Sequence, residues 1–140
     1  MKTLSAVAML SPLLLCGCET GYLRQMDVTD RPGIAISTTT NVDETLVVAL
    51  RIYASEQGLT CDRTSTLPIR CARPPVQIFA FRTPDGAIVC YGALGMPLEN
   101  SKHEASTQQL ERALVTSFGK DNVTSGQLTH SWSERCKHGA

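Results

Sequence analysis

The sequence predicts an α+β domain in which an antiparallel-rich sheet of about five to six strands carries two helices on one face. The chain has 140 residues, 42% of them hydrophobic and 19% charged, which is the composition of a single globular domain. Two segments repeat apolar residues at helical spacing, and several short runs rich in β-branched or apolar residues lie between turn sequences. The predicted order is β-α-β-β-β-β-α-β.

A strand and a helix are predicted at the start of the folded region. Residues 33–40 contain several β-branched side chains, which favours a strand. Asn41 then stands three residues before Glu44, a pattern typical of a helix N-terminus. Apolar residues follow at helical spacing, and Gly58 can adopt the left-handed conformation that ends a helix. We therefore expect a helix over about 42–57.

Four short strands are predicted in the middle of the chain, within 59–62, 69–72, 76–82 and 87–91. The last two flank the sequence Thr83-Pro84-Asp85-Gly86, in which proline presets one turn dihedral and glycine accepts a positive φ. This predicts a hairpin. Both faces of its strands are apolar, so we expect the hairpin at the centre of the sheet.

The second helix and a closing strand are predicted near the C-terminus. Ser101 and Glu104 form a capping box, and apolar residues at helical spacing continue to Gly119. From Leu128 to Trp132, apolar or aromatic side chains alternate with small polar ones, which is typical of a half-buried strand.

The first residues have the pattern of an export signal. Lys2 precedes an apolar run from Leu4 to Leu15, which is too short to cross a hydrocarbon core of about 30 Å as a stable helix. The run ends in Leu15-Cys16-Gly17-Cys18, which resembles the lipobox of bacterial lipoproteins. We therefore divide the chain into a signal peptide (1–17), a tether that begins with the lipidated cysteine (18–32) and one α+β domain (33–140).

The lipoprotein resemblance implies where the protein lies. Cys18 would carry a diacylglycerol group on its sulfur, through a thioether, and an acyl chain such as palmitate on its amine. Together these lipids hold the chain at a membrane. Glu19 stands where an inner-membrane retention signal would place Asp, so the resemblance favours the periplasmic side of the outer membrane. The alternative is cleavage elsewhere, before Cys16 or after Gly21, which would release a soluble periplasmic protein.

The remaining cysteines, at positions 61, 71, 90 and 136, are even in number, as expected for disulfides in an exported protein. Four cysteines permit three pairings. We favour Cys61–Cys71, because both lie near the facing ends of neighbouring strands, which leaves Cys90–Cys136. Zinc ligands usually stand two to four residues apart, so this spacing does not favour a metal site. A redox role would require a Cys-x-x-Cys pair or an activated thiol, and Arg70 beside Cys71 is the one feature in that direction.

Charge and motifs narrow the function. The chain has 13 basic and 13 acidic residues, so it has no net positive charge that would attract nucleic acid. Nucleic acid is therefore not an expected partner. The sequence has no catalytic or phosphate-binding motif, so we expect neither catalytic residues nor a cofactor or metal. Arg63, Arg70, Arg73 and Arg82 occur in a stretch without acids, which could form a patch for anions; alternatively, they are outward residues beside helix acids.

Two functions remain as hypotheses. The first is a non-enzymatic binding or assembly component of the cell envelope, attached to the membrane by Cys18 and facing another envelope protein or an anionic envelope component. The second is a periplasmic inhibitor or immunity-type protein that occludes a lytic or toxic enzyme. For the second, the 62–68 loop closed by Cys61–Cys71 is the best inhibitory element. A small enzyme would instead require a pocket in which a histidine and a serine or acid converge.

Overall fold

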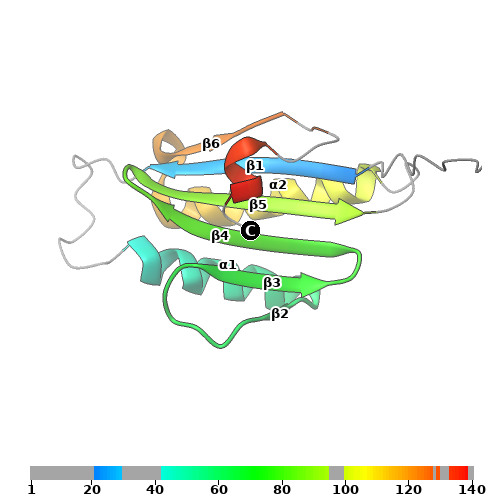
Figure 1. The fold of residues 1–140 in the computed structure, drawn as a ribbon, viewed down its shortest axis with the longest axis horizontal. Coiled ribbons are helices and arrows are strands. Elements are labelled where there is room, and N and C mark those ends of the chain that lie inside the picture. Colours follow the sequence, from blue (N-terminus) through cyan, green and yellow to red (C-terminus); the bar gives the residue numbers. More distant parts are fainter. Residues whose placement is uncertain (1–20, 30–41, 95–99, 128, 130–132, 139–140) are drawn as a thin grey trace, which may run out of the picture.

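A computed structural model describes residues 21–29, 42–94, 100–127, 129 and 133–138. It contains one antiparallel sheet in the order β2-β3-β4-β5-β1-β6, with α1 and α2 on one face and the short α3 on the other (Figure 1). The elements are β1 (Gly21–Thr29), α1 (Val42–Gln57), β2 (Thr60–Cys61), β3 (Ile69–Arg73), β4 (Val76–Thr83), β5 (Gly86–Leu94), α2 (Asn100–Phe118), the 3-10 turn η2 (Lys120–Asn122), β6 (Val123–Ser125) and α3 (Glu134–His138). The predicted α+β class is confirmed.

The two long helices form where the spacing of the apolar residues predicts them, although α2 already begins at Asn100, so Ser101 lies inside the helix. Asp43 and Glu44 stand in the first turn of α1, where negative charge favours the free N–H groups. Gly58, at φ 71°, ends this helix as expected. The buried faces of α1 and α2 pack with one face of the sheet to form the main core, in which Leu50 and Leu114 are almost fully buried.

The predicted tether is wrong for residues 21–29, which form strand β1 inside the sheet. This strand pairs with β5 along its full length, from Gly21 opposite Leu94 to Thr29 opposite Gly86, and with β6 on its other side. Its apolar side chains alternate toward the main core, but polar residues separate them, which hides the strand pattern in the sequence. The strand predicted at 33–40 lies outside the described residues.

The hairpin of β4 and β5 is confirmed, and it occupies the centre of the sheet. Thr83 faces Gly86 across the turn, and Gly86 has a positive φ of 153°. At the C-terminus the sequence missed β6 and α3. Most of the strand predicted at 128–132 lies outside the described residues; Thr129 forms a bridge with Leu23 of β1.

Both favoured disulfides are present. Cys61–Cys71 joins directly paired residues of β2 and β3, with a Cα–Cα distance of 3.9 Å, and Cys90–Cys136 joins β5 to α3 at 6.0 Å. The second bridge belongs to a small core on the sheet face opposite the long helices, together with Phe79. In the described part of the chain, no helix is both long and apolar enough to cross a membrane.

Candidate functional site

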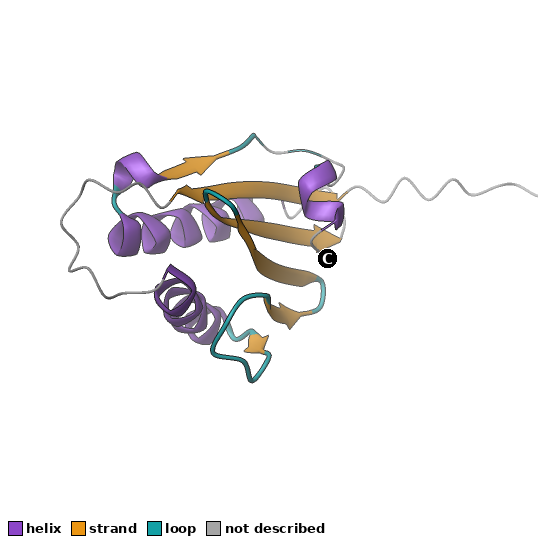
Figure 2. Cartoon of the chain, turned by 60° about the vertical axis from the view of Figure 1, so that its left-hand side comes forward, coloured by secondary structure: helices purple, strands orange, loops and turns teal. Residues whose placement is uncertain are grey.

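The loop of residues 62–68 is held both by α1 and by the strands β2 and β3 from which it leaves and to which it returns. Arg51 of α1 donates hydrogen bonds to the backbone oxygens of Asp62 (2.6 Å) and Thr64 (2.5 Å). The Asp62 carboxylate accepts a bond from the backbone N–H of Arg70, and the Cys61–Cys71 bridge closes the base. Figure 2 shows this loop at the lower edge of the sheet, beside α1. The loop is therefore a rigid projection.

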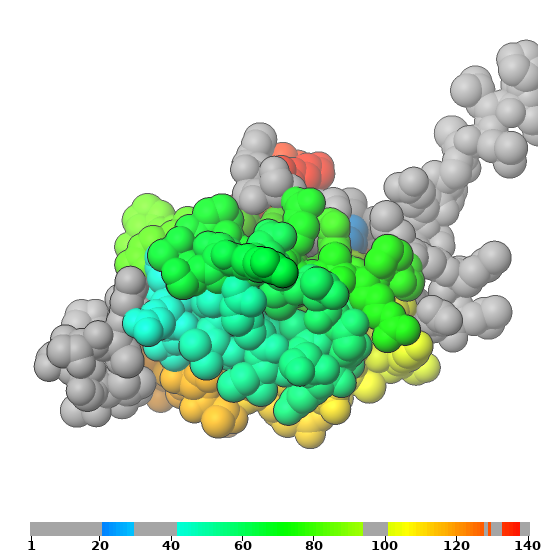
Figure 3. Space-filling view, turned by 90° about the horizontal axis from the view of Figure 1, so that it is seen from below, coloured from blue at the N-terminus to red at the C-terminus, as the bar shows by residue number. Residues whose placement is uncertain are grey.

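A groove of about 490 Å³ lies between this loop and α1. It is lined by Glu44, Val47, Val48, Arg51, Arg63, Thr64 and Ser65. Val48 and Ile52, one helical turn apart, are 51% and 57% exposed, and no other large hydrophobic side chain of the described chain is as exposed. Figure 3 shows α1 in cyan to green on the face seen from below. We call the groove, Val48 and Ile52 the α1–loop surface.

The four arginines predicted as one anion patch do not come together. Arg82 forms an ion pair with Asp43 at the start of α1, whereas Arg73 reaches the glycine at its end, and a helix of 16 residues is about 24 Å long. Arg70 points to the opposite sheet face, because its neighbours Ile69 and Cys71 occupy the main core. Of the four predicted arginines, only Arg63 lines the groove. The prediction that these four arginines form a single anion patch is therefore wrong.

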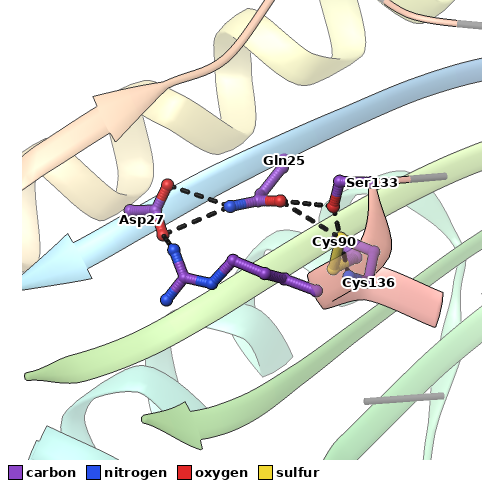
Figure 4. A network of polar contacts seen from close by, with 6 residues as sticks. Gln25, Asp27, Cys90, Ser133 and Cys136 are labelled. Atoms are coloured by element: carbon purple, nitrogen blue, oxygen red, sulfur yellow. Dashed lines mark hydrogen bonds and ion pairs between the residues drawn. A yellow bond between two sulfur atoms is a disulfide. The ribbon is translucent and has the colours of Figure 1, made fainter. Parts of the chain in front are cut away.

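A cavity of about 250 Å³ between β1 and α3 is surrounded by a polar network (Figure 4). The Gln25 amide donates to Asp27 (3.1 Å) and accepts from the Ser133 hydroxyl (2.5 Å). Asp27 also binds Arg135 (3.0 Å), and the Ser133 oxygen accepts from the Cys136 backbone N–H (3.1 Å) at the start of α3. These bonds hold α3 on β1. Among the described residues that line the cavity, none is a histidine that could activate Ser133 as a nucleophile.

A buried polar cluster joins α2 to the sheet within the main core. Tyr91 hydrogen-bonds His103 at 3.2 Å, and Tyr22 hydrogen-bonds Thr107 at 3.1 Å. Tyr53 of α1 donates to the backbone oxygen of Ser106 on α2. Burial raises the pKa of Tyr91 to about 12 and also raises the pKa of Tyr53. These side chains are buried and out of reach of a ligand, so the cluster holds α1 and α2 together and α2 against the sheet.

These tyrosines predict a loss of stability in alkali. Their pKa values in the folded state lie above the ordinary value of 10, so their stabilising effect is complete below pH 10 and is lost as pH rises toward 12. In urea denaturation at pH 8, 10 and 11, we expect the free energy of unfolding to fall above pH 10, and to fall less steeply for Tyr91→Phe. Parallel pH profiles of the two proteins would contradict this.

The described residues contain no group of three or more His, Cys, Asp or Glu side chains placed to hold a metal ion. Comparison of the chain with models of known protein families and with curated proteins finds no match.

Proposed function

We propose that the chain is a lipid-anchored lipoprotein of the bacterial cell envelope whose domain binds a protein partner and is not an enzyme. The export signal and the lipobox at Cys18 support the anchor. Two disulfides in a small domain support an oxidising compartment such as the periplasm. The residue after Cys18 supports the outer membrane as the site of attachment.

The α1–loop surface carries the proposal of protein binding. Val48 and Ile52 form an apolar stripe at i,i+4 spacing, and Val48 also lines the groove, so the stripe and the groove form one continuous surface. Arg63 is exposed beside the stripe and has no ion pair among the described residues. The chemistry therefore fits a partner that places apolar side chains on Val48 and Ile52 and a carboxylate against Arg63.

Paired charge substitutions test this surface. We expect Val48→Asp combined with Ile52→Asp to weaken partner binding at least about 30-fold, because two apolar contacts near the centre of an interface would be replaced by carboxylates that need water. The partner is first identified through a photo-crosslinking side chain at position 52 in cells, and its affinity for the purified protein is then measured.

The matched control is Thr116→Asp, an exposed position on α2. It should leave the affinity unchanged, and circular dichroism should show that all variants are folded. Binding that survives the double substitution would contradict the proposal, as would a partner that crosslinks equally well from position 116.

A second candidate function is inhibition of a periplasmic lytic or toxic enzyme. The fixing of the 62–68 loop by Arg51 and the disulfide favours it, because a rigid loop enters a cleft with little loss of entropy. Under this function Ser65→Trp at the loop abolishes inhibition of the captured hydrolase, whereas the Val48 and Ile52 pair has a smaller effect. Under the first function the order is reversed.

Lipidation of Cys18 has its own test. We expect mass spectrometry of the membrane-bound product to find an N-terminal Cys18 with diacylglycerol and an acylated amine, and Cys18→Ser to lose membrane attachment. A mature N-terminus elsewhere, with no lipid mass, would contradict the anchor.

A further inference from the structure

We propose that the end of the sheet at which β1 begins rests on the lipid headgroups, so that the groove of the α1–loop surface lies at a distance from the membrane. This inference rests on the proposed anchor at Cys18. It goes further because it names the part of the domain that contacts lipid and says how far from that part the binding surface lies.

The short distance between Cys18 and the sheet carries the inference. Only Glu19 and Thr20 separate the lipidated residue from Gly21, the first residue of β1. Three Cα–Cα steps of about 3.8 Å span at most about 11 Å. The headgroup layer of each leaflet is itself about 5–8 Å thick. Because β1 pairs with β5 from Gly21 onward, the sheet end at which β1 begins is held within this distance of the lipid.

Strand register identifies the residues at that end. Tyr22 pairs with Ala93, which pairs with Val76, which pairs with Arg73. The exposed β3–β4 turn, Pro74-Pro75, therefore lies level with the start of β1, as Figure 1 shows.

The start of α2 lies at the same end of the sheet. His103 bonds Tyr91, only two residues from the Ala93 position on β5, so the neighbouring exposed Lys102 also lies at this end. Arg73 and Lys102 provide cations for lipid phosphates, while the exposed Glu56 and Glu104 at the same end are opposing charges. The covalent anchor, rather than net charge, holds this end against the headgroups.

The same register places the loop at a distance from the membrane. Ile69, where the 62–68 loop returns to the sheet, pairs with Ala80, which is level with Val89 and Met26. Met26 is four residues along β1 from Tyr22, or about 13 Å at 3.3 Å per residue. The groove lies against residues 44–51 of α1, and the first turn of this helix is the end far from the anchored end. A partner can therefore reach the α1–loop surface without contacting lipid.

Two native lysines test the orientation. Lys102 lies at the anchored end of α2 and Lys120 just beyond its other end, next to β6, and both are exposed. The full lipidated protein is placed in vesicles of phosphatidylcholine and phosphatidylglycerol, whose headgroups have no primary amine, and both lysines are labelled with a membrane-impermeant amine reagent. The comparison variant has ten Gly and Ser residues inserted between Thr20 and Gly21, which adds an r.m.s. span of about 17 Å.

We expect the ratio of the labelling rate at Lys102 to that at Lys120 to rise at least threefold when the spacer is inserted. An unchanged ratio in protein whose Cys18 carries lipid by mass spectrometry would overturn the orientation and leave the anchor intact. Absence of lipid on Cys18 would overturn both. Partner binding through Val48 and Ile52 is measured separately, so its failure is distinguishable from either result.

Discussion

Replacing Cys90 and Cys136 together by alanine should lower the free energy of unfolding by about 4 kcal/mol, according to the chain-entropy model for a bridge of this span. The sequence separation of 46 residues makes the unfolded chain much freer once the bridge is gone. The bridge also attaches α3, whose five residues are too few to form a stable helix alone. Chemical denaturation followed by circular dichroism measures the loss.

The matched control is the pair Cys61→Ala and Cys71→Ala, which opens a bridge with a separation of 10 residues. The same model gives a smaller loss of about 3 kcal/mol. Hydrogen exchange separates the two local effects: only the Cys90 and Cys136 pair should remove protection from the Cys136 amide, which Ser133 now caps. A loss below about 1 kcal/mol with this amide still protected would contradict the argument.

Local signals were enough to predict α1, α2 and the central hairpin. Each helix has acceptors at its start, one apolar face and a glycine just beyond its end, and the hairpin has its own turn sequence. The signals for β1 are not local. Arg24 bonds Thr107, 83 residues away, and Asp27 pairs with Arg135, 108 residues away. These polar side chains resemble a solvated tether until their distant partners are known.

In the candidate site, too, some features could be predicted from the sequence and others could not. The disulfide pairing followed from the proximity of predicted strands, and the structure confirms it. The arginine patch failed because alternation along β3 sends Arg70 to one face and Arg73 to the other. The exposed stripe also has a signal in the sequence, because Val48 and Ile52 are apolar but lie off the face of α1 that is buried in the core.

Gly86→Ala is expected to lower the free energy of unfolding by about 3–5 kcal/mol, the sum of backbone strain and overpacking. A Cβ atom at Gly86 would lie 2.0 Å from the backbone oxygen of Val28 and 3.0 Å from the Cα of Thr29. Both atoms belong to the backbone of β1, so relief requires β1 to separate from β5. Urea denaturation of the variant measures the cost.

Gly119→Ala is the matched control, because Gly119 also has a positive φ, 90°, but its Cβ would meet nothing closer than 3.9 Å. Strain alone should therefore cost about 1–2 kcal/mol there. The difference between the two variants isolates the close approach of β1. If residues 21–29 were a tether, as their polar sequence indicates, no strand would lie beside Gly86 and the two substitutions would cost the same. The pair of measurements thus tests whether β1 is an inner strand, the condition on which the membrane-facing orientation depends.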